Sequence, residues 1–251
     1  MPQIDAIIKY RVINFIYPAM YEVFMINENT EHSALIREED KKFLTNQFRK
    51  KLSKTVTLIV FTSSDKKCMY CDKAVEIIEE VSSLSDKIKT VKYSFENDRE
   101  MVEKYHVKKY PAIIVTSERI RDSRVVFYGL PSGYEFGSLV ESIESASMDE
   151  PEIADKAKEI ISGINMPVKI TVYITPTCQY CPRASTIANK FAILNQNISS
   201  EITEILEFGD EDEIKDIEKV PYIKVNDRII VIGTHTEEQF AEFVMGATKE
   251  Q

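Results

Sequence analysis

Residues 168–182 of the chain read VKITVYITPTCQYCP, and this stretch decides the fold. The run Val168–Thr175 is rich in β-branched and aromatic residues, which is typical of a strand. Two cysteines spaced as C-x-x-C, Cys178 and Cys181, follow this run, and apolar residues at helical spacing begin after them. The stretch therefore predicts a buried strand and a pair of cysteines that closes the strand and opens a helix.

The same arrangement occurs earlier in the chain. Residues 55–72 read TVTLIVFTSSDKKCMYCD, and their cysteines, Cys68 and Cys71, lie 110 residues before the later pair. A proline that precedes an apolar run is also repeated after 110 residues, as Pro111 and Pro221. Repetition of several features at one offset indicates internal duplication. The sequence therefore predicts two copies of one folding unit.

Each copy is expected to fold in the order β–α–β–α–β–β–α, as a mixed four-stranded sheet flanked by helices, which is an α/β fold. We place the first unit at residues 34–147 and the second at 148–251. Residues 1–33 are interpreted as an N-terminal extension, for which a true start at Met20 or Met25 is an alternative. Second strands are expected at Val91–Phe95 and Ile202–Phe208, and short charged helices near Asp98–Tyr105 and Glu211–Glu218.

Charge and hydropathy exclude several classes of protein. The 251 residues carry a formal net charge of −9, which argues against a protein that coats nucleic acid or anionic lipid. The apolar run Val12–Ile26 is broken by Asn14 and Glu22 and is too short to span a membrane, and Tyr21–Phe24 would make a poor cleavage site for a signal peptide. We therefore expect a cytoplasmic protein without a nucleic-acid or membrane partner.

The spacing of each cysteine pair suits thiol–disulfide exchange. Residues three apart on a helix have Cβ atoms about 5–6 Å apart, which is close enough for a disulfide. At a helix N-terminus the unpaired N–H groups and the helix dipole favour the thiolate, which is the nucleophile. We therefore expect Cys68 and Cys178 to attack a substrate disulfide. The second cysteines, Cys71 and Cys181, are expected to be shielded and to resolve the mixed disulfide.

A strand, a C-x-x-C motif, a helix and a later proline that opens a strand resemble the thioredoxin/glutaredoxin family. The stretch Thr177–Pro182 is close to the glutaredoxin signature, which also has Tyr before the second cysteine. Two such units in one chain resemble the archaeal-type protein disulfide oxidoreductases, relatives of protein disulfide isomerase, from about residue 34 onwards. The resemblance implies that Pro111 and Pro221 are cis. It also implies that the corners Tyr110-Pro111 and Val220-Pro221 dock the substrate.

The resemblance implies a two-site thiol–disulfide oxidoreductase that reduces, forms or isomerises disulfides in protein substrates. Such an enzyme has no bound cofactor, and by the same resemblance its electrons come from NADPH through a partner like thioredoxin reductase. We expect the second site to be the more active, because the first lacks a proline after its second cysteine. Tyr70 and Tyr180 either line the substrate groove or only pack beside the helix.

One departure from the family pattern concerns the group that accepts the proton of the resolving cysteine. The buried Asp of thioredoxins, six residues before the first cysteine, is replaced here by Thr62 and Val172. The proton acceptor for each resolving cysteine is therefore unassigned, and Glu96 and Asp98 are the candidates that lie near the first site in the sequence.

Three other interpretations of the cysteines remain open: a structural zinc site with four cysteine ligands, inert structural disulfides, and a redox-linked chaperone or binding module. Zinc ribbons usually separate their cysteine pairs by roughly 15–20 residues, whereas 106 residues intervene here. The spacing thus favours two redox pairs, with no metal, over a zinc site.

Overall fold

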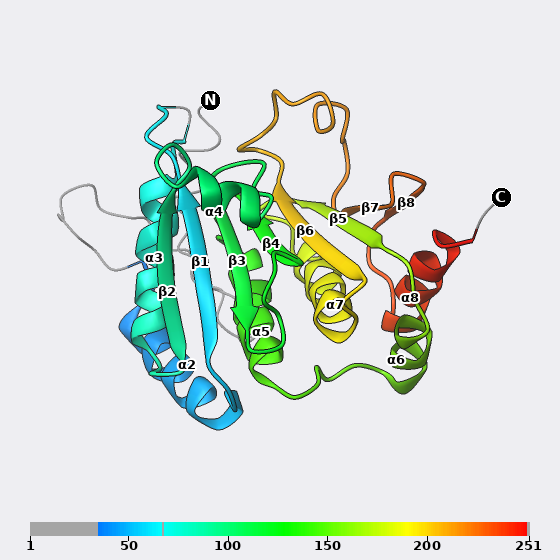
Figure 1. The fold of residues 1–251 in the computed structure, drawn as a ribbon, viewed down its shortest axis with the longest axis horizontal. Coiled ribbons are helices and arrows are strands. Elements are labelled where there is room, and N and C mark those ends of the chain that lie inside the picture. Colours follow the sequence, from blue (N-terminus) through cyan, green and yellow to red (C-terminus); the bar gives the residue numbers. More distant parts are fainter. Residues whose placement is uncertain (1–34, 67, 250–251) are drawn as a thin grey trace.

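The structure is a computed structural model that describes residues 35–66 and 68–249 (Figure 1). The predicted extension, residues 1–33, lies outside the described residues. The first half of the chain contains α2 (Glu38–Lys51), β1 (Val56–Thr62), α3 (Cys71–Ser83), β2 (Ile88–Ser94), α4 (Arg99–Lys104), β3 (Ala112–Ser117), β4 (Val125–Tyr128) and α5 (Glu135–Ser147). The second half contains α6 (Asp155–Ser162), β5 (Val168–Ile174), α7 (Cys181–Leu194), β6 (Ile198–Glu204), β7 (Tyr222–Val225), β8 (Ile229–Ile232) and α8 (Glu237–Gly246).

The strands of both halves form one continuous sheet of eight strands in the order β2-β1-β3-β4-β6-β5-β7-β8. The predicted tandem α/β fold is confirmed, with a four-stranded mixed sheet in each half. The sequence did not predict that the two sheets join. They join where β4 pairs in parallel with β6, with Val125 opposite Ser200 and Tyr128 opposite Thr203.

Strand direction places both cysteine motifs on one side of the molecule. Strands β1 and β4 run the same way because each is antiparallel to β3, and β4, β6 and β5 are mutually parallel. Since β1 and β5 run in the same direction and each precedes a C-x-x-C motif, both motifs lie at the same edge of the sheet, the one formed by the C-terminal ends of β1 and β5. The two prolines precede β3 and β7, the antiparallel neighbours of β1 and β5, and therefore also lie at this edge.

Alternation along the strands divides the apolar residues of the first half between two cores. Successive side chains of a strand point to opposite faces. In β1, Leu58 and Val60 join the main core, which continues through helices α3, α5 and α7 into the second half. Ile59 and Phe61 face the other way and form a smaller core with Val102 of α4. The main core has no break between the two halves, and this continuity makes them one packed body.

Two predictions for the second half differ from the structure, a strand in its bounds and a helix in its existence. The strand expected at Ile202–Phe208 is β6, at Ile198–Glu204. Its polar residues misled the prediction, because Ser200 is fully buried against α7 rather than exposed. The helix expected at Glu211–Glu218 is absent from the described segment, which forms turns. Like charges at helical spacing destabilise a helix, and this segment is mostly acidic. In the described part of the chain, no helix is both long and apolar enough for a membrane span.

A buried polar network fastens the junction of the two halves. Asn189 of α7 donates from Nδ2 to Ser142 Oγ of α5 at 2.9 Å, and its Oδ1 accepts from Ser200 Oγ of β6 at 2.6 Å. All three side chains are at most 2% exposed, so solvent cannot replace these bonds.

Replacing Asn189 with Leu should destabilise the protein, because both serine hydroxyls lose a buried partner. We expect a loss of about 1–3 kcal/mol in the free energy of unfolding, measured as a lower denaturant midpoint at unchanged slope. Asn46→Leu is the control, since Asn46 is exposed on α2. Equal unfolding free energies for Asn189→Leu and the control would contradict the role of the network.

Candidate functional site

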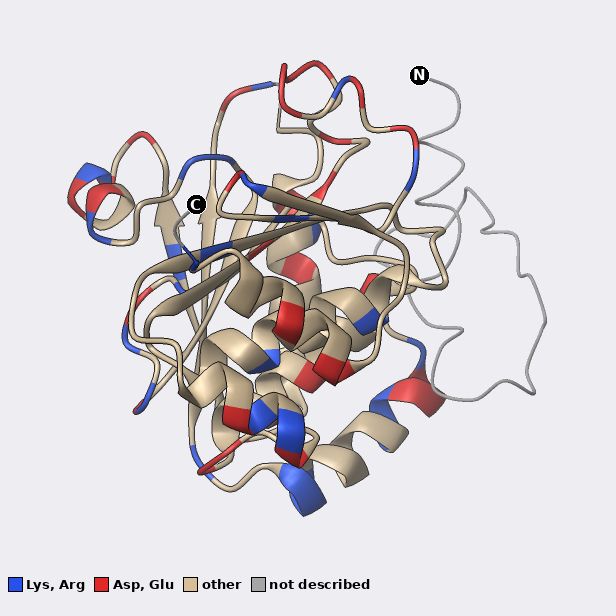
Figure 2. Ribbon diagram, turned by 90° about the vertical axis from the view of Figure 1, so that its right-hand side faces the viewer, with Lys and Arg blue, Asp and Glu red and all other residues tan. Residues whose placement is uncertain are grey.

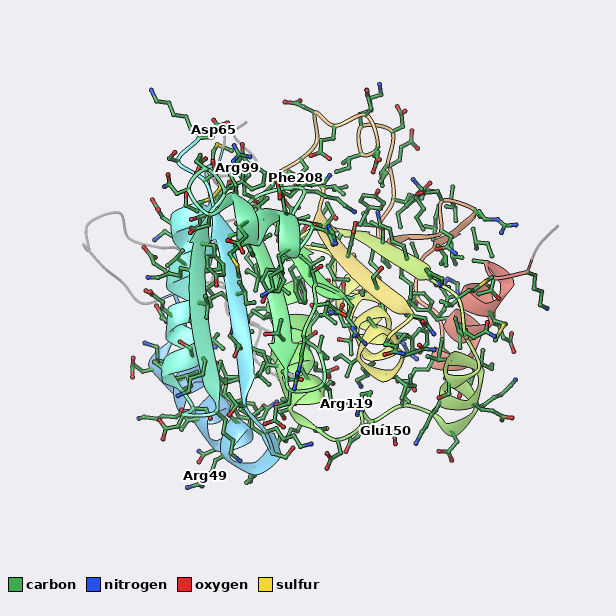
Figure 3. All side chains as sticks on the ribbon, in the orientation of Figure 1. Arg49, Asp65, Arg99, Arg119, Glu150 and Phe208 are labelled. Carbon is green, nitrogen blue, oxygen red and sulfur yellow. A yellow bond between two sulfur atoms is a disulfide. The ribbon has the colours of Figure 1, made fainter. Side chains whose placement is uncertain are left out.

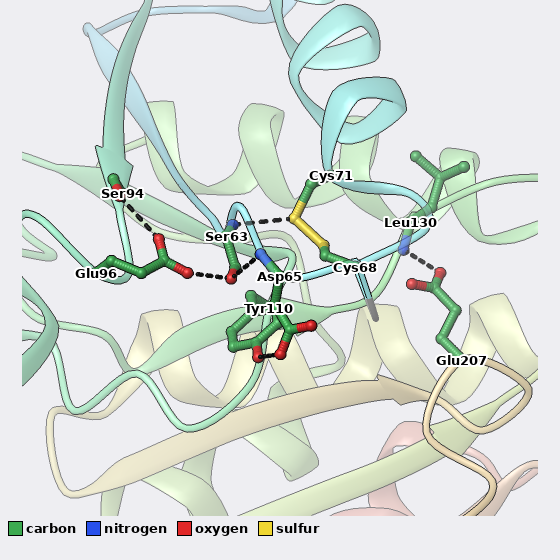
Figure 4. The surroundings of a disulfide bond; sticks show 9 residues. All are labelled: Ser63, Asp65, Cys68, Cys71, Ser94, Glu96, Tyr110, Leu130 and Glu207. Atoms are coloured by element: carbon green, nitrogen blue, oxygen red, sulfur yellow. Dashed lines mark hydrogen bonds between the residues drawn. A yellow bond between two sulfur atoms is a disulfide. The ribbon is translucent and has the colours of Figure 1, made fainter.

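The first candidate site is the disulfide between Cys68 and Cys71, whose Cα atoms are 5.5 Å apart. Cys71 is the first residue of α3 and is only 4% exposed, whereas Cys68 lies in the preceding loop and is partly exposed. The backbone N–H of Ser63, just after β1, donates to Cys71 Sγ at 3.2 Å (Figure 4). A substrate can therefore approach Cys68 and not Cys71.

The carboxylate of Glu96 is hydrogen-bonded to Ser63, the residue whose backbone N–H contacts Cys71. The Ser63 hydroxyl bonds Glu96 Oε1, and Ser94 Oγ donates to Glu96 Oε2 at 2.9 Å (Figure 4). These hydrogen bonds, that from Ser63 above all, lower the pKa of Glu96, so the group is an anion at neutral pH. Asp98, the other candidate, instead accepts the N–H of Ser94 at the start of α4. Of the two sequence candidates, Glu96 is the one connected to the site.

The second candidate site is the disulfide between Cys178 and Cys181, again with Cα atoms 5.5 Å apart. Cys181 begins α7 and is fully buried, and Pro182 occupies the first turn, where its missing N–H costs no hydrogen bond. Cys178 is partly exposed, and its Sγ lies 3.8 Å from the carbonyl oxygen of Val220. The second site thus repeats the pattern of one accessible and one enclosed cysteine.

Both prolines have the cis peptide bonds that the resemblance implies, at Tyr110-Pro111 and Val220-Pro221. Their carbonyl oxygens accept equivalent bonds, Pro111 from the N–H of Gly129 and Pro221 from that of Gly233, each at 2.9 Å. Each proline is therefore held by the glycine that follows the second strand of its hairpin, and at the second site the preceding residue, Val220, adjoins Cys178.

The tyrosines named from the sequence differ in their surroundings. Tyr70 is 7% exposed and belongs to the main core, whereas Tyr180 is 59% exposed beside Cys181. Tyr110, which precedes the first proline, donates from its hydroxyl to Asp65 Oδ2 at 3.1 Å (Figure 4). Its ring also packs on that of Phe95. Of the two tyrosines before the second cysteines, only Tyr180 is placed where a substrate can touch it.

A buried carboxylate near the second site was missed by sequence reasoning. Glu135, at the start of α5 in the first half, is 1% exposed, and its Oε2 accepts from Ser138 Oγ at 2.5 Å. Its neighbour Tyr134 donates its backbone N–H to the carbonyl of Pro176, two residues before Cys178, at 3.0 Å. Glu135 belongs to the first half and lies near α7, the helix of the second site, only because the two halves are joined, so no local motif could have revealed it.

The environment of Glu135 favours its protonated form. Burial raises the pKa of this carboxyl to about 7, and the hydroxyls of Ser138 and Ser185 oppose the shift only in part. Ser185 lies four residues after Cys181 on α7, and hence on the same face of that helix. Glu135 Oε1 has no hydrogen-bond partner among the described residues. A carboxyl of this kind exchanges protons near neutral pH.

The four sulfur atoms pair within their own motifs rather than converging on one point. Among the described residues, no group of three or more His, Cys, Asp or Glu side chains is arranged to hold a metal ion. Each site thus combines a buried cysteine at the first residue of a helix, a partly exposed cysteine and a cis-proline corner, an arrangement that suits dithiol–disulfide exchange.

Comparison with known proteins agrees with this geometry. The thioredoxin domain family matches residues 168–245. The chain is 28% identical over 205 residues to a protein of Ferdinandcohnia aciditolerans named NADH dehydrogenase, covering 82% of this chain and 36% of that protein. It is 31% identical over 122 residues to an alkyl hydroperoxide reductase component of Pseudomonas aeruginosa, covering 48% and 23%. The chain thus spans about a third or less of these curated relatives.

Two solved structures cover nearly the whole of the described chain. A protein disulfide oxidoreductase from Aeropyrum pernix superposes with a TM-score of 0.76 at 27% identity, covering 84% of this chain and 93% of that one. The alkyl hydroperoxide reductase protein AhpF of Enterococcus faecalis, in a mutant form, shares the fold with a TM-score of 0.76 at 22% identity, covering 83% and 99%. The chain is therefore a tandem thioredoxin-fold protein with two C-x-x-C disulfides, similar over most of its length to the disulfide oxidoreductase of A. pernix.

Proposed function

We propose that the chain is a thiol–disulfide oxidoreductase that reduces, forms or isomerises disulfides in protein substrates through its two C-x-x-C sites. The observation that carries the proposal is the same in both sites. An accessible cysteine lies beside a cis-proline corner, and its disulfide partner is enclosed at the first residue of a helix. A structural crosslink has no need of this asymmetry, whereas a two-step exchange requires it.

In the reductive direction, the thiolate of Cys178 attacks one sulfur of the substrate disulfide. A bond forms between the two sulfurs, and the other substrate sulfur leaves as a thiolate that takes up a proton. Cys181 then loses its proton and attacks Cys178, which restores the protein disulfide and releases the second substrate thiolate. Cys68 and Cys71 perform the same steps at the first site. Reversal of the steps inserts a disulfide, and the relative reduction potentials decide the direction.

The backbone at the proline corners orients the substrate in this proposal. The Val220 carbonyl lies 3.8 Å from Cys178 Sγ, so a peptide strand placed along Val220-Pro221 brings its disulfide to the nucleophile. Tyr110-Pro111 occupies the corresponding position at the first site. Tyr180 adds an exposed aromatic surface to the second site, whereas Tyr70 supports the first site from within the core.

Glu135 is the proton acceptor that we assign to Cys181. The resolving cysteine is fully buried and must lose its proton before it attacks. Ser185, one turn after Cys181 on α7, is near enough to Glu135 to influence its pKa, and a pKa of about 7 lets the carboxyl take a proton at neutral pH and release it afterwards. The carboxyl comes from the first half of the chain, so the second site is complete only when the halves are joined.

Electrons are proposed to come from NADPH through a partner like thioredoxin reductase, with no cofactor bound to this chain. One curated relative is named NADH dehydrogenase, which supports a link to pyridine nucleotides. The chain matches only part of that relative, so we assign the nucleotide to a partner rather than to these residues. We place the activity in the cytoplasm, where thiols are kept reduced and disulfide chemistry is normally catalytic.

Removal of the attacking cysteines should abolish exchange. With dithiothreitol as reductant, insulin reduction is expected to fall by about two orders of magnitude or more in the double variant Cys68→Ser/Cys178→Ser, because no nucleophile remains. Cys178→Ser alone should cost more activity than Cys68→Ser. Full activity in the double variant would overturn the proposed function.

Cys181→Ser should trap clients as mixed disulfides on Cys178, because the resolving step is lost. The measurement is a shift in mass that dithiothreitol reverses, detected after incubation of the reduced variant with insulin. Cys178→Ser/Cys181→Ser is the matched control at this site. Equal client retention by this control, insensitive to dithiothreitol, would instead identify a non-covalent binding module.

Glu135→Gln should slow the second site and change its pH dependence. In a Cys68→Ser/Cys71→Ser background, the rate should rise as pH increases through about 7, because Glu135 ionises there. The Gln variant should lose this rise and be about 10²-fold slower above it. Glu144→Gln is the control, since Glu144 is similarly buried on α5 but pairs with Lys51. A parallel pH profile in Glu135→Gln would remove Glu135 from the mechanism.

Stability provides a second readout that does not depend on turnover. The folded-state pKa of Glu135 lies above that of an unfolded carboxyl, so the folded protein binds the extra proton. Its contribution to stability is complete below the unfolded pKa and is lost as pH rises through about 7. The unfolding free energy of the oxidised protein should therefore fall less steeply with pH in Glu135→Gln. Identical slopes would contradict the raised pKa.

A further inference from the structure

The turns beside the two proline corners are equivalent in sequence position but not in exposure. The first-site turn, residues 128–130, and the second-site turn, residues 232–234, each contain a glycine that donates to the local proline carbonyl at 2.9 Å. A Cβ atom added to Gly233 would meet nothing within 4 Å. The same atom on Gly129 would lie 2.9 Å from Glu204 Cβ and 3.0 Å from Glu207 Oε1. The second half of the chain therefore fills the space beside the first site.

The residues around each glycine show the same difference. Tyr128 and Leu130 are 3% and 7% exposed at the first site. At the second site Ile232 is 50% exposed and Thr234 is also exposed. A substrate chain thus finds an open apolar surface at the second site and a covered one at the first.

Residues 205–211, which follow β6, cover the first-site turn, and we call them the covering segment. Glu207 Oε1 accepts the backbone N–H of Leu130 at 2.6 Å, and Figure 4 shows this pair beside Cys68. The bond uses the backbone donor that the first-site turn would otherwise offer to a substrate. Burial, together with the charge of Glu204, raises the pKa of Glu207 to about 8. Glu207 thus touches the first half of the chain through this bond, while the residue as a whole stays partly exposed.

Two further contacts hold the covering segment across the first half. Phe208 packs against the smaller core, and Lys109 Nζ lies 5.2 Å from its ring centroid. Lys109 also forms an ion pair with Glu211. Since Lys109 directly precedes Tyr110, these contacts fasten the segment next to the first proline corner (Figure 3, where Phe208 is labelled).

Acidic residues are concentrated on this segment and on the turns that continue from it, which form the upper loop in Figure 2. Only some of them make the cover. Asp212, just beyond the segment, is exposed and pairs with Lys215, which belongs to the same loop. The loop therefore contains both anchoring carboxylates and a carboxylate that serves as an internal control.

We propose that the covering segment restricts the first site to small disulfides, whereas the second site accepts extended protein segments. This inference rests on the proposed exchange activity. A small disulfide needs only the accessible sulfur of Cys68, while a protein segment also needs backbone and surface along the proline corner. The covering segment occupies part of that surface at the first site, and no described residue fills the space beside Gly233. Specificity arises here from exclusion of the larger substrate.

The chemistry is the same for both substrate classes. The reduced Cys68–Cys71 pair converts one disulfide into two thiols and is itself oxidised to a disulfide, so two electrons and two protons pass to the substrate. A protein reduced beforehand by dithiothreitol and then freed of it supplies these electrons for a single turnover.

The test compares two full-length single-site proteins. Cys178→Ser/Cys181→Ser retains the first site, and Cys68→Ser/Cys71→Ser retains the second. Each reduced protein is mixed with excess bis(2-hydroxyethyl) disulfide or with insulin, and its remaining thiols are counted by alkylation and mass measurement. The quantity compared is the rate with insulin divided by the rate with the small disulfide. We expect this ratio to be about tenfold or more lower for the first site.

Loss of the anchors should raise the ratio at the first site. Glu207→Ala/Glu211→Ala should increase it several-fold through the insulin rate, with the small-disulfide rate unchanged. Asp212→Ala should leave the first-site ratio unchanged. Glu207→Ala/Glu211→Ala should also leave the ratio of the second-site protein unchanged, and normal activity there would show that this variant folds. Glu207→Gln keeps an acceptor for the N–H of Leu130. With Glu211 intact, this variant should therefore keep the low ratio of the first site.

The outcomes separate this inference from the proposed function. Equal ratios for the two single-site proteins, or a first-site ratio that the anchor variant does not raise, would overturn the restriction while leaving exchange intact. Absence of reaction with the small disulfide at both sites would instead overturn the proposed function itself.

Discussion

The parallel pairing of β4 with β6 is the interaction on which the rest of the structure depends. Each unit by itself would expose an edge strand at this place, and such an edge is a template for pairing with another chain. Here the edge of one unit meets that of the other, with Val125–Tyr128 opposite Ser200–Thr203. The pairing extends the sheet to eight strands. It also fixes the relative direction of the strands in the two halves, so that both disulfides lie at the C-terminal ends of β1 and β5.

The junction also places groups of one unit within the site of the other. Glu135 belongs to the first half and faces the helix that begins at Cys181, whereas Glu207 belongs to the second half and lies beside Cys68 (Figure 4). The duplicated motifs are therefore not equivalent in their surroundings. A buried carboxyl lies near the helix of the second site, and the space beside Gly233 is open, whereas Glu204 and Glu207 fill the space beside Gly129 at the first site.

Much of the fold could be predicted because its signals are local. The strand, the C-x-x-C pair and the helix stand next to each other in both halves, and their fixed offset from Pro111 and Pro221 identifies the repeat. The fold of the second site was predictable from Thr177–Pro182 for the same reason. By contrast, Ser199, Ser200 and Glu201 make the first part of β6 mostly polar, and Ser200 is acceptable there because Asn189 bonds it across the core. Contacts between residues distant in sequence, such as that of Glu207 with Leu130, leave no periodic pattern to recognise.

The central claim is that each site combines one reactive and one enclosed cysteine. The most direct measurement is the pH dependence of alkylation of the reduced, folded protein by iodoacetamide, followed residue by residue by mass spectrometry. The account predicts that Cys68 and Cys178 react with midpoints below about 8.5, the pKa of a free cysteine, and that Cys71 and Cys181 react only after unfolding. Equal reactivity of the two cysteines within a pair, or preferential reaction of Cys71 or Cys181, would contradict it.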